Sequence, residues 1–116
     1  MNYFDKSDFD SPDVKGSNRH MSEVLIEMLN IARHHAKTPF IITSAYRTRE
    51  HNAKVKGSKT SSHLRGLAVD IACSDSIKRQ LIISALVETG FERIGIAKTF
   101  IHVDIDDSKP NSIWLY

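Results

Sequence analysis

The chain has 116 residues, 41% of them hydrophobic, which suffices for one compact domain, so we expect a single domain over residues 1–116. Its formal net charge of +2 is small, and its lysines and arginines are interspersed with acids instead of forming the basic stripe of a nucleic-acid-binding protein. No apolar run approaches the roughly 20 residues that cross a bilayer. One cysteine, Cys73, excludes an internal disulfide. We therefore expect a monomer that neither binds nucleic acid nor spans a membrane.

The N-terminal segment, residues 1–18, is polar and acidic, unlike the charged-then-apolar pattern of a secretory signal peptide. We therefore expect the protein to be made in the cytoplasm without a signal peptide, so that a substrate outside the cell would require another route of release. Asp, Ser, Pro and Gly stand at turn positions through this segment, which indicates an irregular lead-in.

The first regular element that the sequence predicts is a helix over residues 21–36. Its apolar residues recur at helical spacing, which indicates an amphipathic helix. Thr38 and Pro39 end it, because the residue before a proline disfavours the helical conformation. Residues 40–43 (FIIT) are then typical of a short buried strand, and residues 44–48 leave this strand as a loop.

The middle of the chain combines helices, a loop and a strand. Residues 49–55 favour a short helix, and residues 57–62 (GSKTSS) indicate a flexible loop. Residues 67–72 (LAVDIA) alternate between large apolar side chains and small or polar ones, which predicts a strand with one buried face. Asp75 is a candidate N-cap for a second long helix, which ends at Gly90.

Three further strands are predicted after this helix, over residues 92–96, 100–105 and 111–116. The strand over residues 100–105 alternates like the earlier one, with its apolar residues on one face. The connections are short, which favours an antiparallel sheet with helices on one face. The predicted fold class is therefore α+β, a small antiparallel sheet with flanking helices.

Two of the predicted strands place metal-binding groups on the face opposite their apolar rows. Asp70 lies between two alanines, and His102 and Asp104 share a face because they are two residues apart. Burying a carboxylate costs on the order of several kcal/mol unless it is paired or bound to a metal. A catalytic zinc ion takes three protein ligands and keeps a fourth position open, and a set of two histidines and one aspartate fits. A closed structural zinc site is disfavoured, because the chain has no paired cysteines.

Three segments together resemble the signature of the M15 metallopeptidases. Residues 61–70 (SSHLRGLAVD) are similar to the Ser-x-His-x-x-Gly-x-Ala-x-Asp motif of this family. Residues 43–48 (TSAYRT) are similar to its Ser-Gly-Tyr-Arg-Ser segment, and residues 100–105 (FIHVDI) to its third block, in the form of compact phage-type members. The family comprises D-Ala-D-Ala carboxypeptidases and murein endopeptidases and shares a fold with the hedgehog signalling domain. The resemblance covers residues 20–116.

The resemblance implies roles for five residues. His63, Asp70 and His102 match the three ligands of one zinc ion. Arg47 matches the arginine that holds the substrate carboxylate or polarises the scissile carbonyl, and a guanidinium fork suits both tasks. Ser61 matches a serine that lines the substrate cleft.

One position departs from the family pattern. Many members carry an acidic base three residues before the last zinc histidine, and Thr99 stands at that position in this chain. A threonine does not accept a proton from water at neutral pH. The predicted base is therefore Asp104, about 7 Å along the same strand face as His102. An alternative register makes Asp104 the third ligand and His102 a catalytic neighbour.

Other residues that invite a functional reading are interpreted as structural. Tyr46 and Trp114 are interpreted as packing residues instead of substrate contacts, and Glu50 and Asp106 as weak candidates for an acidic role. The remaining histidines have no partner at metal-ligand spacing, namely His20, His34, His35 and His51.

The sequence therefore predicts a zinc-dependent peptidase that hydrolyses peptide bonds in peptidoglycan stem peptides or cross-links, either endolysin-like or D,D-/L,D-carboxypeptidase-like. The absence of a signal peptide and of a wall-binding module favours a phage or prophage enzyme that reaches the cell wall at lysis or in a virion. The competing hypothesis is a catalytically inactive, zinc-stabilised binding module of the same fold, which Thr99 at the usual position of the base favours.

Overall fold

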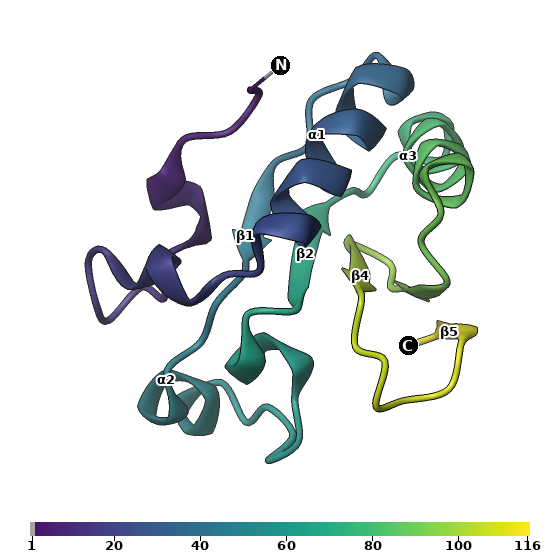
Figure 1. The fold of residues 1–116 in the computed structure, drawn as a ribbon. Helices are drawn as coiled ribbons and strands as arrows, with labels where there is room; N and C mark the ends of the chain where they lie inside the picture. The colour runs from purple at the N-terminus through teal and green to yellow at the C-terminus, as the bar shows by residue number, and fades with distance from the viewer. Residues whose placement is uncertain (1) are drawn as a thin grey trace.

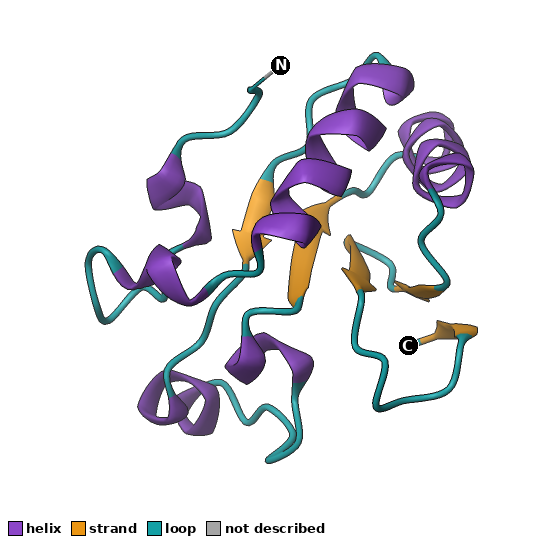
Figure 2. Cartoon of the chain, in the orientation of Figure 1, coloured by secondary structure: helices purple, strands orange, loops and turns teal. Residues whose placement is uncertain are grey.

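A five-stranded sheet with helices packed over one face forms the centre of the fold (Figures 1 and 2). The computed structural model describes residues 2–116, so Met1, the first residue of the predicted lead-in, lies outside it. The strands, in the spatial order β1-β2-β4-β3-β5, are β1 (Ile42–Ser44), β2 (Ala68–Ala72), β3 (Arg93–Ile96), β4 (Phe100–Asp104) and β5 (Ser112–Leu115). The helices are α1 (Glu23–Ala36), α2 (Arg49–Lys54) and α3 (Ser76–Thr89), with the 3-10 helices η1 (Lys6–Phe9), η2 (Ser17–His20) and η3 (Ser62–Arg65). The α+β class predicted from the sequence is confirmed.

The sheet is mixed, because its last strand runs parallel to its neighbour. β1, β2, β4 and β3 pair antiparallel in that order, as expected. β5 pairs with β3 in parallel. The chain reverses direction after β4, but β3 already occupies the adjacent position, so β5 returns along the far side of β3. The predicted antiparallel sheet thus gains one parallel pairing at its edge.

Both long helices end where the sequence indicates, and α3 also begins there, whereas α1 begins two residues after the predicted start. The Ser22 hydroxyl accepts a hydrogen bond from the Leu25 N–H at the start of α1 (3.2 Å). The Asp75 carboxylate accepts one from the Lys78 N–H at the start of α3 (2.9 Å). α3 ends at Gly90, whose φ of 107° is open to glycine without strain. Neither of these helices, nor any other within residues 2–116, has the length and apolar character that a membrane crossing requires.

The core lies between α1, α3 and the apolar rows of the two central strands. Val69 and Ile71 of β2 are fully buried, as are Ile101 and Val103 of β4, in one cluster with apolar residues of both helices. Side chains alternate along a strand, so the residues between these four point to the opposite face of the sheet. That second face carries the polar residues that the sequence singled out.

The N-terminal segment is more ordered than the irregular lead-in expected there. It contains η1 and η2, and Phe4 and Phe9 are buried in the core. The Asp10 carboxylate accepts hydrogen bonds from the N–H groups of Gly16 and Asn18 (3.0 and 2.7 Å), which closes the loop between the two 3-10 helices. The segment therefore packs as part of the domain.

Candidate metal centre

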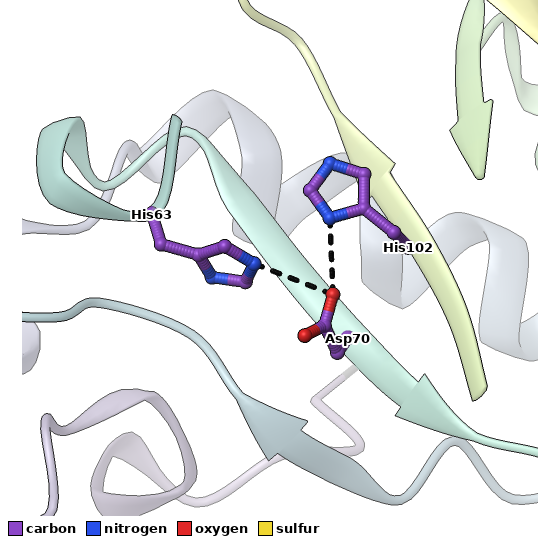
Figure 3. Close-up of side chains that lie close together, drawn as sticks. All are labelled: His63, Asp70 and His102. Atoms are coloured by element: carbon purple, nitrogen blue, oxygen red, sulfur yellow. Dashed lines mark hydrogen bonds and ion pairs between the residues drawn. The ribbon is translucent and has the colours of Figure 1, made fainter. Parts of the chain in front are cut away.

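Three side chains from the predicted signature converge on the polar face of the sheet (Figure 3). Asp70 of β2 lies directly opposite His102 of β4 in the antiparallel register, and His63 comes from η3, just before β2. Gly66 turns the chain from η3 into β2 with a φ of 68°. A Cβ on Gly66 would lie 2.0 Å from the His20 carbonyl oxygen, so this turn requires glycine.

The facing atoms of these three side chains are close enough to share one cation. His63 Nε2 lies 3.3 Å, and His102 Nδ1 3.0 Å, from the same atom, Asp70 Oδ1 (Figure 3). The three candidate ligand atoms all lie within 4.8 Å of one another. Both histidines are buried, so a cation held here would be shielded from most of the solvent. The structure thus brings together the three residues that the resemblance implies as ligands.

Partners on the far side of each imidazole decide which ring nitrogen carries the proton. His63 Nδ1 lies 2.7 Å from the carbonyl oxygen of Ala45, which only accepts hydrogen bonds, so His63 donates from Nδ1. His102 Nε2 faces the Asp104 carboxylate at 2.7 Å in the same way. In the neutral rings, the lone pairs of His63 Nε2 and His102 Nδ1 therefore point at Asp70. Three acceptors with no donor between them repel one another, and a bound cation removes that repulsion.

The charges around Asp70 favour a cation at this point. Burial alone would raise the pKa of the Asp70 carboxyl, but hydrogen bonds and charge from His102 and His63 in their protonated forms hold this pKa well below its usual range. Burial lowers the pKa of His102, yet hydrogen bonds to the Asp104 and Asp70 carboxylates raise it above its ordinary value. In the absence of a metal, His102 therefore retains a proton more readily, and a metal ion competes with that proton for the site.

Asp104 shares the sheet face with His102, as the alternation predicts, but both of its oxygens are already engaged. Oδ2 accepts a hydrogen bond from His102 Nε2, and Oδ1 accepts from Arg93 Nε (2.7 Å) and from the Asp106 N–H (3.0 Å). The side chain is 1% exposed. It lies behind the imidazole, on the side away from Asp70, where a carboxylate orients a metal-binding histidine. These contacts favour a positioning role for Asp104 over the roles of base or third ligand.

Arg47 reaches the same carboxylate from the loop after β1. Its Nη2 lies 3.5 Å from Asp70 Oδ2. Its Nε donates to Ser44 Oγ (3.0 Å) and its Nη1 to Asn52 Oδ1 (3.3 Å). A Cβ on Gly57 would lie 2.1 Å from Asn52 Oδ1 and 3.0 Å from Arg47 Nη1, so glycine there lets the loop close over both. The guanidinium is thus held beside the candidate ligand atoms by contacts within the chain.

A buried carboxylate, Asp106, ties η3 to the chain that follows β4. It is 1% exposed, and it accepts hydrogen bonds from Ser62 Oγ (2.7 Å) and Arg65 Nη1 (2.8 Å). Ser61 Oγ accepts from the His63 N–H (3.2 Å) at the start of η3, and Ser61 lines the cavity that contains the candidate ligand atoms. The sequence made Asp106 only a weak candidate for an acidic role, and its contacts make it the anchor of the segment that carries His63.

β5 adds an aromatic wall that the sequence interpretation missed. A cavity of about 360 Å³ at the candidate ligand atoms is lined by Trp114 of β5 and by Tyr116, the residue that follows β5. The Trp114 ring lies 5.4 Å from that of His102, centroid to centroid. Gly95 of β3 makes room for it, because a Cβ there would lie 2.6 Å from Trp114 Cε2. Trp114 therefore packs on the sheet and also lines the cavity. Both contacts depend on the pairing of β5 with β3.

Within residues 2–116, this cavity is lined by no acidic side chain that is free of partners. Its acidic lining residues are Asp70 and Asp104. Thr99, at the usual position of the base, lies exposed in the turn between β3 and β4, and its carbonyl accepts a hydrogen bond from the Cys73 N–H (2.9 Å). Thr99 therefore stands in place of the base that many family members carry, and no free acidic side chain lines the cavity within the described residues to take over its role.

The comparison with protein families agrees with this geometry. A family model described as Peptidase M15 matches residues 6–104, a range that includes the three metal-binding candidates, Arg47 and Asp104. No curated protein matches the chain. β5 and its aromatic residues lie beyond the matched range. Because the match spans most of the sequence, the chain belongs to the Peptidase M15 family.

Proposed function

We propose that this chain is a zinc-dependent peptidase that hydrolyses peptide bonds in the stem peptides or cross-links of bacterial peptidoglycan. The observation that carries the proposal is the convergence of His63 Nε2, His102 Nδ1 and Asp70 Oδ1 on one point. Membership of the Peptidase M15 family supports the reaction class. The peptidoglycan substrate is inferred from the resemblance to D-Ala-D-Ala carboxypeptidases and murein endopeptidases.

The donor set fits a catalytic zinc ion. Zinc binds nitrogen and oxygen ligands at about 2.0–2.1 Å in a tetrahedron, so its ligand atoms lie about 3.3 Å apart. The spacings of 3.3 and 3.0 Å between the histidine nitrogens and Asp70 Oδ1 are of this size. Two histidines and one carboxylate leave the fourth position for water. When bound there, zinc lowers the pKa of water to about 7 and polarises the scissile carbonyl.

The chain's own residues position the substrate and the metal ligands. Arg47 binds a substrate carboxylate or the negative charge that develops on the carbonyl oxygen, because its guanidinium is already fixed in the cavity. Asp104 orients His102 through Nε2. With the acidic side chains of the cavity engaged, solvent at the cavity mouth would accept the proton of the attacking water and supply the proton that the leaving amine needs. A positioned base contributes about 10²–10⁴-fold in rate, so we expect a slow peptidase.

Digestion of purified peptidoglycan tests the proposal. The zinc-loaded protein is compared with chelator-stripped protein and with a His63→Ala variant, and soluble products are identified by mass spectrometry. We expect peptide release only by the zinc-loaded protein, with activity restored to the stripped protein by added zinc. The masses distinguish loss of a terminal residue from cleavage within a stem or cross-link. Equal release by stripped protein would contradict zinc dependence, and no release at all would contradict the peptidase.

A second candidate function has a specific observation in its favour. Thr99 stands where many members carry the base, and Asp104 is fully engaged by its neighbours. A zinc-stabilised binding module without catalysis would retain the metal site and would not need a base. It predicts zinc-dependent sedimentation of the protein with intact peptidoglycan and no released peptide. The phage or prophage setting stays a prediction from the sequence.

A further inference from the structure

A second and larger cavity adjoins the metal centre. It has a volume of about 790 Å³, which is in the range of small-ligand pockets. It lies between α2 and the segment leading into η3, which gather at one end of the sheet (Figure 1). The residues shared by both cavities are Arg47, Gly57, Ser61 and Lys109. A single extended ligand can therefore occupy the metal cavity and this groove together.

The groove is strongly cationic. Its charged lining comprises five cations, Arg47, Arg49, Lys59, Arg65 and Lys109, and one acid, Asp106. Asp106 is buried and is already paired with Arg65 (2.8 Å), with the Lys109 ammonium 3.8 Å away. Within residues 2–116, Arg49 and Lys59 take part in no ion pair. The positive charge of the groove is therefore only partly neutralised by acidic side chains of the chain.

The rest of the lining argues for a short peptide instead of a phosphate polymer. Tyr46, Ala53 and Leu64 provide apolar surface inside the groove. The cations line the same cavity as this apolar surface, and the cavity shares Arg47 with the metal cavity. A protein that binds a polymer of phosphates instead presents a continuous basic stripe. Apolar surface with a few placed charges suits a ligand that has aliphatic stretches between its anionic groups.

We propose that this groove binds the carboxylates of an acidic peptide, namely the part of the substrate that extends away from the scissile bond. This inference rests on the proposed peptidase function and names its substrate class: a peptide with at least two free carboxylates beyond the one that Arg47 can hold. Arg49 and Lys59 are the residues that discriminate acidic from amidated peptides. Exposed ion pairs are worth about 0.2–1 kcal/mol, which is roughly 1.5- to 5-fold in affinity for each.

Charge reversal at the two unpaired cations tests the proposal. The double variant Arg49→Glu/Lys59→Glu is compared with the control Lys6→Glu/Lys78→Glu, which changes the net charge equally. Both control residues are exposed, lie outside the groove and stand near helix N-termini, where a glutamate is tolerated. The probes are a fluorescent stem tetrapeptide with free carboxylates, the same peptide fully amidated, and poly(glycerol phosphate). Affinity for the zinc-loaded proteins is measured by fluorescence anisotropy at two salt concentrations, and hydrolysis in parallel.

We expect the groove variant to bind the acidic peptide about 2- to 25-fold more weakly, and the control variant to bind it like the wild type. Full amidation should weaken wild-type binding by more than this factor, because it also removes the carboxylate that Arg47 can hold, and should weaken binding to the groove variant less. Equal effects in both variants, no effect of amidation, or tighter binding of poly(glycerol phosphate) than of the peptide would overturn the proposal. Binding with these properties but without hydrolysis would contradict the peptidase and not the groove.

Discussion

Replacing Asp104 by Asn removes the charged acceptor behind His102 and nearly preserves the shape of the side chain. Asp104 accepts three hydrogen bonds, from His102, Arg93 and the Asp106 N–H. Asparagine offers one neutral oxygen to these three donors, so the His102 ring loses its charged partner. Partners of this kind are worth about 10- to 100-fold in metal affinity, which corresponds to about 1.4–2.7 kcal/mol.

The assay separates metal affinity from the chemical step. Zinc dissociation constants are measured at pH 7.5 by competition with a chromophoric chelator, and peptide hydrolysis is then measured with zinc saturating each protein. Asp104→Asn should bind zinc about 10- to 100-fold more weakly and regain most of the wild-type rate once saturated. Asp106→Asn is the matched control, because Asp106 is equally buried and also paired with an arginine but does not contact His102. It should lower stability and change zinc affinity less.

The opposite result would refute the positioning role. If zinc affinity were unchanged and hydrolysis at saturating zinc fell by about 10²–10⁴-fold, Asp104 would be the base predicted from the sequence. In that case the hydrogen bond from His102 Nε2 to Asp104 would have to open during turnover, because both Asp104 oxygens are engaged in this structure.

Three other positions give independent tests of the site and the fold. Thr99→Glu supplies an acid at the family's usual position and should raise kcat by about 10²-fold, and an unchanged kcat would show that this position does not reach the attacking water. Gly95→Ala forces the Trp114 ring away from β3. Overpacking of this kind costs about 1–3 kcal/mol, so urea unfolding should show lower stability and the emission of Trp114, the only tryptophan, should shift. Burial opposes ionisation of Asp106, but hydrogen bonds from nearby serines and the charge of an arginine lower its pKa below the unfolded value of about 3.9. Its stabilising contribution is therefore complete above that value and lost as the pH falls below it, so Asp106→Asn should flatten the fall in unfolding free energy between about pH 5 and 2. An acid-unfolding curve identical to that of the wild type would contradict this assignment.

The convergence of the metal-binding residues follows from local patterns in the sequence. Alternation along two strands predicts that Asp70 and His102 each lie on the polar face, and antiparallel neighbours bring them opposite one another. The motif around His63 supplies the third residue at the end of a short loop. The helix boundaries at Asp75 and Gly90 are also local, because a cap and a left-handed turn each depend on one residue type.

The parts that could not be predicted depend on strand order and on side-chain conformation. The alternation places Asp104 on the correct face, but it does not show that its carboxylate turns toward His102 Nε2 and toward Arg93 on β3. Trp114 reaches His102 only because β5 pairs in parallel with β3 on its far edge. The burial of Phe9 gave no periodic signal, because it is an isolated aromatic residue in a polar segment.

The most direct test of the central claim is a crystal structure of the zinc-loaded protein with anomalous data collected at the zinc edge. We expect one strong peak on the polar face of the sheet, about 2.0–2.1 Å from His63 Nε2, His102 Nδ1 and an oxygen of Asp70, with Asp104 still hydrogen-bonded to His102 Nε2. A peak coordinated by Asp104 in place of His102, or no peak at this position, would contradict it.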